Sequence, residues 1–333
     1  MNELILLAHV PTDSVNDGFI PAARRLGLSV VLLTDAVDAH LAHFTQVGLE
    51  AYPDEIIACD VADAQAVIGV LTCRERQPVA VFSNSARLQT CAALAAEYFG
   101  LPGKDWHVTY RARNKGEMRR RLQAQGLDAL WHAVVCEMTQ IPDELPFPCI
   151  VKSREGGAGQ HVTLARDRAA LKAQCAVAWV VQPGLPLVLE QYIEGPLYRL
   201  ETLGDGRELR VVGGFKVAVS PPPYFVALDA RWGTGLPAAQ VEAVLRIIRE
   251  FGIAFGACHT EFVMSPRGPR IIEIDYCNVA DYREFDAPGI DLFETVLRLH
   301  LGEPLPALAR RVRAEPSRMD WSTLGAMVGV PVN

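Results

Sequence analysis

The first hundred residues alternate apolar segments of strand length with segments of helical composition, and this alternation limits the fold more than any other feature. The apolar runs are LILLAHV, SVVLLTD, EIIACD and VAVFSN, and PAARRLGL and AQAVIGVLTC lie between them. Such alternation is typical of an open parallel sheet covered by helices. The segment LAHVPTDSVNDG after the first strand lacks the glycine fingerprint GxGxxG, so dinucleotide binding is not supported.

The pattern changes beyond residue 105. A basic helical segment, NKGEMRRRLQAQGL, precedes the strand-like HAVVCEM and PCIVK, and from Leu187 onward short strands are broken by Gly and Pro, as in an antiparallel sheet. We therefore expect an α/β chain with an α+β second half. Its expected parts are an N-terminal Rossmann-like domain over 1–105, a small central subdomain over 106–186 and a C-terminal antiparallel-sheet subdomain over 187–333.

Composition excludes several classes of function. The chain of 333 residues has a net charge of -7, which argues against a protein whose main function is to bind nucleic acid, because binding of the phosphate backbone needs a basic face. No apolar run reaches the roughly 20 residues of a membrane span, and MNELILLAHV is read as a first strand and not as a signal peptide. The eight cysteines are scattered singly, which predicts reduced thiols in a cytoplasmic protein.

Three carboxylates are expected to converge on one hairpin. If the turn SPRG is centred on Arg267, Glu261 lies opposite Glu273, and Asp275 follows on the same face about 7 Å further along the strand. Like charges opposite each other destabilise a sheet, and a hard cation such as Mg²⁺ would compensate them. A solvated acidic face is the other interpretation, and the apolar residues on either side make it less favoured.

A glycine-rich loop follows a strand lysine in VKSREGGAGQHV. A Walker A loop has its lysine after the glycines, whereas here Lys152 precedes Gly156, Gly157 and Gly159. The segment therefore predicts a hairpin flap whose backbone amides approach phosphate oxygens while the lysine supplies charge. An ordinary surface hairpin is the alternative.

Three further side chains are candidates from their positions. Lys115, in the basic helical segment, is a second cation that could flank a triphosphate, or it only makes a helix soluble. Glu190 ends an apolar strand, and the residues after it could present backbone groups to a purine; a strand-end carboxylate without function is equally common. His259 precedes Glu261 by two residues on one strand face, where it contacts metal-bound phosphates or is a core histidine.

Taken in order, these segments resemble the ATP-grasp superfamily, specifically its carboxylate-amine (L-amino acid) ligases. NKGEMRRRLQAQGL and FPCIVKSREGGAGQHV are similar to its lysine-bearing helix and its strand lysine with glycine flap. VLEQYIEGPLYRLETL is similar to its linker, PPPYFVAL to a segment of the amino-acid ligases, and CHTEFVM with RIIEID to the metal-binding strands. The resemblance covers nearly the whole chain.

The resemblance implies that ATP lies between the central and C-terminal subdomains with two Mg²⁺ ions, for which Mn²⁺ can substitute. The γ-phosphate passes to a substrate carboxylate, and an amine then attacks the acyl phosphate. The implied phosphate-binding residues are Lys115, Lys152, Gly156, Gly157 and Gly159, those at adenine are Glu190 and Ile193, and the metal ligands are Glu261, Glu273 and Asp275.

The chain departs from the family pattern at three positions. Leu197 stands where a glutamate usually contacts ribose, Asp275 replaces the usual asparagine ligand, and Cys277 replaces an arginine. We expect Lys216 or Arg283 to take over the role of that arginine. Together with His259, these two are the candidate catalytic residues.

The sequence thus predicts an ATP-dependent ligase that joins a small-molecule carboxylate to an amine through an acyl phosphate. Its expected substrates are amino acids or natural-product building blocks, for example peptide or siderophore-like ones. No nucleic acid or membrane partner is expected, and a homodimer is left open. Two alternatives stay open as well: an ATP-binding regulatory or scaffold protein of the same fold without turnover, and a small-molecule kinase.

Overall fold

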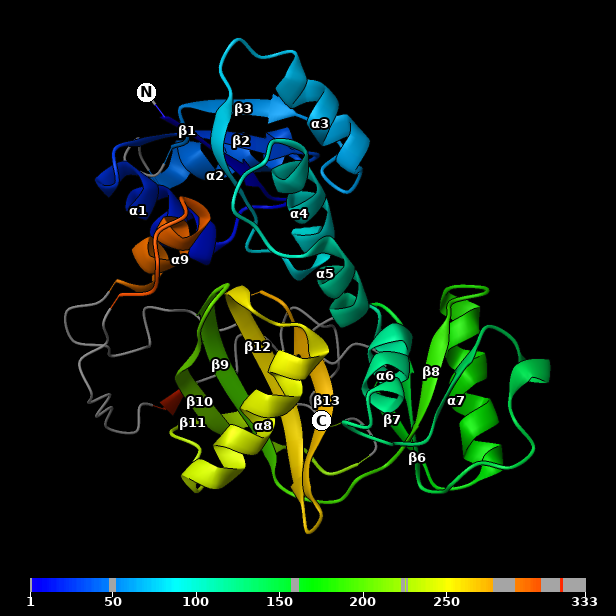
Figure 1. Cartoon of the computed structure of the whole chain (residues 1–333). Coiled ribbons are helices and arrows are strands. Elements are labelled where there is room, and N and C mark those ends of the chain that lie inside the picture. The colour runs from blue at the N-terminus through cyan, green and yellow to red at the C-terminus, as the bar shows by residue number, and fades with distance from the viewer. Residues whose placement is uncertain are drawn as a thin grey trace.

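The residues that the computed structural model describes form three sheets, arranged in an upper and a lower part that a helix connects (Figure 1). It describes residues 2–47, 52–156, 162–222, 225, 227–277, 291–306 and 318–319. No helix within those ranges is both long and apolar enough to cross a membrane. The mixed α/β class that the sequence predicts is confirmed.

The N-terminal sheet is parallel throughout, with the strand order β3-β2-β1-β4. Most of the apolar residues of β1, β2 and β4 are buried because helices cover them, which confirms the Rossmann-like architecture. The strands are β1 (Asn2–Leu7), β2 (Leu28–Thr34), β3 (Glu55–Ala58) and β4 (Pro78–Phe82). The helical segments are η1 (Ser14–Phe19), α1 (Ile20–Arg25), α2 (Val37–Val47), α3 (Ala64–Thr72), η3 (Ala86–Leu88) and α4 (Gln89–Tyr98).

The helix α9 (Leu292–His300) returns from the far end of the chain to the N-terminal domain, where it lies beside α1 (Figure 1). The ring of Phe293 packs edge-on against Phe19 at 4.9 Å, and Arg25 donates to Glu294 at 2.6 Å. The expected boundary places all of 187–333 in the C-terminal subdomain, whereas α9 also packs against the N-terminal domain. The cluster of buried residues that contains Phe293 also includes Leu203, Phe215 and Ala257 of the C-terminal sheet, so α9 packs between that sheet and the N-terminal domain.

The central subdomain is a four-stranded antiparallel sheet with the order β5-β8-β6-β7. β8 (Leu187–Gln191) lies in its interior, so this sheet extends past the boundary expected at residue 187. The reason is that the apolar β8 is buried and needs a partner on each side. The other elements are β5 (His132–Val135), β6 (Cys149–Ser153), β7 (Thr163–Ala165), α6 (Lys115–Ala124), α7 (Arg168–Val181) and η4 (Met138–Gln140).

The C-terminal sheet is antiparallel, with the order β13-β12-β9-β10-β11-β14. One of its faces is covered by α8 (Ala238–Phe251), and α5 (Trp106–Arg113) runs from the N-terminal domain toward it (Figure 1). The strands are β9 (Leu197–Asp205), β10 (Leu209–Val219), β11 (Ala227–Trp232), β12 (Phe255–Ser265), β13 (Gly268–Asp275) and β14 (Arg318–Met319). The other face of the sheet packs in part against α9 and the N-terminal domain, and Lys115 and Lys152 of the central subdomain reach it at β13.

We predict that Phe293→Ala destabilises the N-terminal domain, because α9 completes its core. Phe293 is 6% exposed, and truncation of a buried phenylalanine costs about 3–5 kcal/mol. Tyr98→Ala is the control, since Tyr98 is 61% exposed on α4 of the same domain, and we expect it to cost less than about 1 kcal/mol. Urea unfolding measures both values, and equal costs would contradict the placement of α9.

Candidate active site

The hairpin of β12 and β13 brings the acidic side chains together as the sequence predicts. Glu261 lies opposite Glu273, and His259 lies opposite Asp275. Since cross-strand partners share a face and residues two apart along a strand do so too, all four side chains belong to one face. This is the face that α8 does not cover, and it is turned toward the central subdomain.

The turn of this hairpin differs from the expectation. It consists of Pro266 and Arg267 and is not centred on Arg267, because the strands pair up to the residues on either side. The register then shifts by one residue between Phe262 and Glu261, and Ile272 of β13 is the extra residue. The bulge offsets the error in the turn, which is why the predicted pairing of the two glutamates is nevertheless correct.

Each of the two opposed glutamates is neutralised by a cation of the chain. The Nε of Arg199, on the neighbouring strand β9, donates to Glu261 Oε1 at 2.8 Å, and the Nζ of Lys115 lies 2.5 Å from Glu273 Oε1. Burial lowers the pKa of Lys115, but the Glu273 carboxylate outweighs it, and the pKa is raised overall. The like charges are therefore compensated without a metal ion, which corrects the reason given for expecting one. No local pattern near Arg199 indicates this contact.

The acidic face nevertheless suits a hard cation in its donor chemistry. Burial raises the pKa of Asp275 to about 7, and the nearby Glu273 carboxylate adds to that effect. Carboxylate oxygens are the ligands that Mg²⁺ takes. In the described ranges, however, no three His, Cys, Asp or Glu side chains form a group that could hold a metal ion as they stand. The metal-binding role of the three carboxylates stays a prediction.

His259 is held by a glutamate that sequence reasoning missed. Its Nδ1 hydrogen-bonds with Glu201 Oε1 of β9, and both side chains are buried. Burial lowers the pKa of His259, but Glu201 and then Glu261 outweigh it and raise the pKa to about 10. Its Nε2 is buried without a hydrogen-bond partner in the described structure and lies 3.6 Å from Glu261 Oε1. His259 thus adds a fixed positive charge to the acidic face.

The strand lysine belongs to a buried network of charges in the central subdomain. Lys152 Nζ lies 2.8 Å from Glu190 Oε2, and Arg119 on α6 donates to both oxygens of Glu190 at 2.9 and 3.0 Å. Burial raises the pKa of Glu190, but the two cations outweigh it and lower the pKa to about 2. Because its oxygens are occupied by side chains, the contact of Glu190 with adenine stays a prediction, and the contribution of Arg119 was missed.

The flap is described only as far as its first glycine. The Nζ of Lys115 donates to the carbonyl oxygen of Gly156 at 2.6 Å, so the two lysines and the start of the flap lie on one side of the acidic face. A side chain at Gly156 would meet Ser153 Oγ at 2.6 Å, which explains the glycine there. Gly157 and Gly159 lie outside the described residues.

Of the remaining candidates, the two that the structure describes, Lys216 and Ile193, show no hydrogen bond or ion pair to the acidic side chains of this face. Lys216 lies opposite Tyr198, which in turn lies opposite Phe262, and these residues belong to the face of the sheet that α8 covers. The side chain of Lys216 is exposed. The expectation that Lys216 replaces the missing arginine is therefore not supported by its position. Ile193 is half-buried between β8 and β9, and Arg283 lies outside the described residues.

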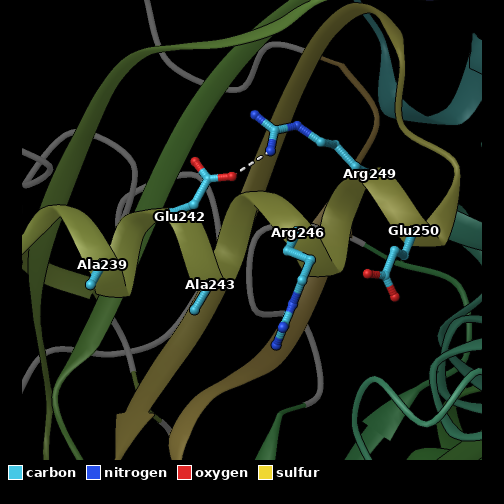
Figure 2. Close-up of a pocket in the computed structure, with 6 residues that line it drawn as sticks. All are labelled: Ala239, Glu242, Ala243, Arg246, Arg249 and Glu250. Atoms are coloured by element: carbon cyan, nitrogen blue, oxygen red, sulfur yellow. Dashed lines mark hydrogen bonds and ion pairs between the residues drawn. The ribbon is translucent and has the colours of Figure 1, made fainter.

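A hollow in the surface of α8 is separate from this face. Its lining comes from that one helix, and Glu242 pairs with Arg249 at 2.6 Å across it (Figure 2). These side chains lie on the side of α8 away from the sheet. We therefore assign the candidate site to the face of β12 and β13 and not to this hollow.

The chain is similar in sequence to known proteins. No family model matches the chain. It is 25% identical to the uncharacterized protein y4rH of Sinorhizobium fredii, over 95% of this chain and 67% of that protein. It is 26% identical to carnosine synthase 1 of Gallus gallus, over 80% of this chain and 31% of that enzyme. The chain thus spans less than a third of the length of the carnosine synthase.

Solved structures share the architecture. An L-amino acid ligase from Bacillus licheniformis superimposes with a TM-score of 0.76 and 24% identity, over 92% of this chain and 75% of that one. The N5-carboxyaminoimidazole synthetase of Staphylococcus aureus in complex with ADP gives a TM-score of 0.72 and 16% identity, over 92% of this chain and 78% of that one. At these identities the likeness shows a common fold.

We predict that Glu190→Gln destabilises the chain, because Arg119 and Lys152 would remain buried without their counter-charge. Removal of one partner of a buried ion pair costs about 3–5 kcal/mol. The pKa of Glu190 is lowered from its ordinary value of 4.5 to about 2. The contribution of the carboxylate is therefore complete above about pH 4.5 and is lost as the pH falls toward 2.

Denaturant unfolding at a series of pH values measures this effect. The difference in the free energy of unfolding between the unmodified protein and Glu190→Gln should shrink as the pH falls from 4.5. Glu97→Gln, which changes an exposed carboxylate on α4, should cost less than about 0.5 kcal/mol at every pH. A difference that stays constant down to pH 2.5 would argue against the network.

Proposed function

The chain has the ATP-grasp fold, and from this premise we propose that it is an ATP-dependent ligase that joins a carboxylate to an amine. The observation that carries the proposal is the meeting of two cations from the central subdomain with the acidic face of β12 and β13. Lys115 reaches Glu273, and Lys152 donates to the carbonyl oxygen of Ile272 at 3.1 Å. Cations and carboxylates at one subdomain boundary are the groups that a nucleoside triphosphate with its metal ions requires.

In this proposal, Lys115 and Lys152 bind the phosphates, and the flap that begins at Gly156 covers them. Glu261, Glu273 and Asp275 would hold two magnesium ions, with Mn²⁺ as a substitute, and these ions would neutralise charge on the transferring phosphoryl group. His259, held as a cation by Glu201, adds positive charge beside the same carboxylates. Such fixed charges lower the barrier because they need no rearrangement when the phosphoryl group moves.

The reaction that fits has two steps. The γ-phosphoryl group moves to a carboxylate oxygen of the substrate, which forms an acyl phosphate and ADP. The amine nitrogen then attacks the carbonyl carbon, the bond to the phosphate oxygen breaks, and phosphate leaves as the amine loses a proton. Neither step needs a covalent bond to the protein. The buried Cys258 and Cys277 have thiol pKa values raised by burial, so neither is an activated nucleophile.

Amino acids or amino-acid-like building blocks are the proposed substrates. The support comes from similarity: a structural neighbour is named an L-amino acid ligase, and a relative in sequence is named a carnosine synthase. A nucleotide-binding protein without turnover is the second candidate, because Leu197 and Cys277 depart from the family pattern. Retention of three carboxylates on one face favours the ligase, because carboxylate oxygens are the ligands that Mg²⁺ takes.

Hydroxylamine trapping distinguishes the candidates. A ligase should form a hydroxamate when ATP, Mg²⁺ and its carboxylate are present, because hydroxylamine replaces the amine in attack on the acyl phosphate. We expect this with at least one member of a matrix of amino acids and short peptides, with ADP release in equal amount. A kinase would release ADP without hydroxamate, and a protein without turnover would release neither.

Glu273→Gln should reduce Mg²⁺-dependent ADP formation at least about 100-fold, because one oxygen ligand loses its charge. Glu250→Gln is the matched control, since this exposed glutamate lies on the outer side of α8, behind the same sheet (Figure 2). Its activity should stay within about twofold of the unmodified protein. Far-UV circular dichroism checks that both variants fold, and full activity in a folded Glu273→Gln variant would remove the metal assignment.

A further inference from the structure

The β-bulge at Ile272 decides which face of the hairpin carries the acidic side chains. Between the turn and Phe262 the two strands pair without interruption, and the register shifts only when Ile272 has been passed. Without that extra residue, Glu261 would lie opposite Ile272. Glu273 would then turn to the face that α8 covers, because a shift of one residue exchanges the faces of a strand. The candidate site therefore depends on this bulge.

Side chains of the central subdomain bind the backbone at the bulge. The N–H of Ile271 donates to Asp128 Oδ2 at 3.1 Å, and the carbonyl oxygen of Ile272 accepts from Lys152 Nζ at 3.1 Å. A bulge interrupts the regular ladder of backbone hydrogen bonds, and buried backbone groups need partners from elsewhere. These two contacts supply partners on both sides of the bulged residue.

Asp128 is well placed for this role. It follows α6, its side chain is fully buried, and its second oxygen, Oδ1, accepts from Arg270 Nη1 at 2.7 Å. Arg119 Nη1 lies 3.6 Å from Oδ2, so the carboxylate also adjoins the buried network around Glu190. A single carboxylate thus contacts two consecutive residues of β13, Arg270 and Ile271, immediately before the bulge.

We propose that Asp128 is a positioning residue that holds the bulge of β13, so that Glu273 and Asp275 face the central subdomain. The structural part of this inference concerns only the register of the hairpin. Its catalytic consequence rests on the proposed ligase function. Asp128 touches neither of those two acidic side chains in the contacts described and acts through the backbone of β13.

Engineered cysteine pairs report the register without any need for activity. Directly opposed residues of antiparallel strands are close enough for a disulfide. In the otherwise unmodified chain, oxidation should link Glu261→Cys to Glu273→Cys in higher yield than Glu261→Cys to Ile272→Cys, because Glu273 is the direct partner. With Asp128→Ala added, the ratio of the first yield to the second should fall at least about threefold. Peptide mapping by mass spectrometry separates these links from those of native cysteines.

Two further variants keep this test decisive. Asp128→Asn keeps an oxygen acceptor for the N–H of Ile271 and should retain the original link. If Asp128→Ala does not fold, the pair Asp128→Ala with Arg270→Ala removes both charges and leaves no unpaired Arg270, and it should show the same shift of register. An unchanged link between positions 261 and 273 in the folded alanine variants would overturn the inference.

Activity provides the second measurement. Asp128→Ala should raise the Mg²⁺ concentration for half-maximal ADP formation at least about tenfold, whereas Asp128→Asn should raise it less than about threefold. If the unmodified chain forms no ADP with any substrate, the ligase proposal fails while the cross-links still decide the role of Asp128. If Asp128→Ala loses activity with its cross-link unchanged, the positioning role fails while the ligase proposal stands.

Discussion

The buried carboxylate of Glu190 is the interaction on which the site depends most. Two cations, Arg119 and Lys152, are buried beside it. Burial of either cation would be strongly unfavourable without the negative charge of Glu190. Lys152 in turn reaches the backbone of Ile272, in the sheet of the other subdomain. The charge balance inside the central subdomain therefore also fixes how that subdomain meets the acidic face of β12 and β13.

The two opposed glutamates on that meeting surface each have a cationic partner before any nucleotide enters. Lys115 is paired with Glu273, and Arg199 is paired with Glu261. A phosphate that binds Lys115 would replace the carboxylate of Glu273 as its anionic partner. A metal ion bound to the two glutamates would replace Lys115 and Arg199 as their cationic partners. Such an exchange of partners keeps every buried charge compensated throughout, which is less costly than assembling the site from separated ions.

The sequence predicted elements better than it predicted their partners. Parallel strands, the strand lysine before the glycines, and the opposed glutamates all follow from local periodicity or spacing. Arg199, Glu201 and Asp128 were missed because they meet the hairpin from positions distant in the chain, and nothing near them in sequence indicates the contact. β8 was assigned to the wrong sheet for the same reason, since an apolar strand does not reveal its neighbours. The predicted pairing of Glu261 with Glu273 is correct only because a bulge that the sequence does not indicate compensates for the wrong position of the turn.

The position of α9 bears on how the chain is made. The N-terminal domain is discontinuous, because part of its core is supplied by Phe293 and its neighbours, almost two hundred residues after α4. During synthesis this domain emerges first, but its core is complete only after α9 has been made. Until the ribosome has passed residue 300, part of the apolar surface of the domain stays uncovered. Exposed apolar surface of this kind attracts chaperones and favours aggregation. The interval between the two segments is the period in which this protein is most vulnerable.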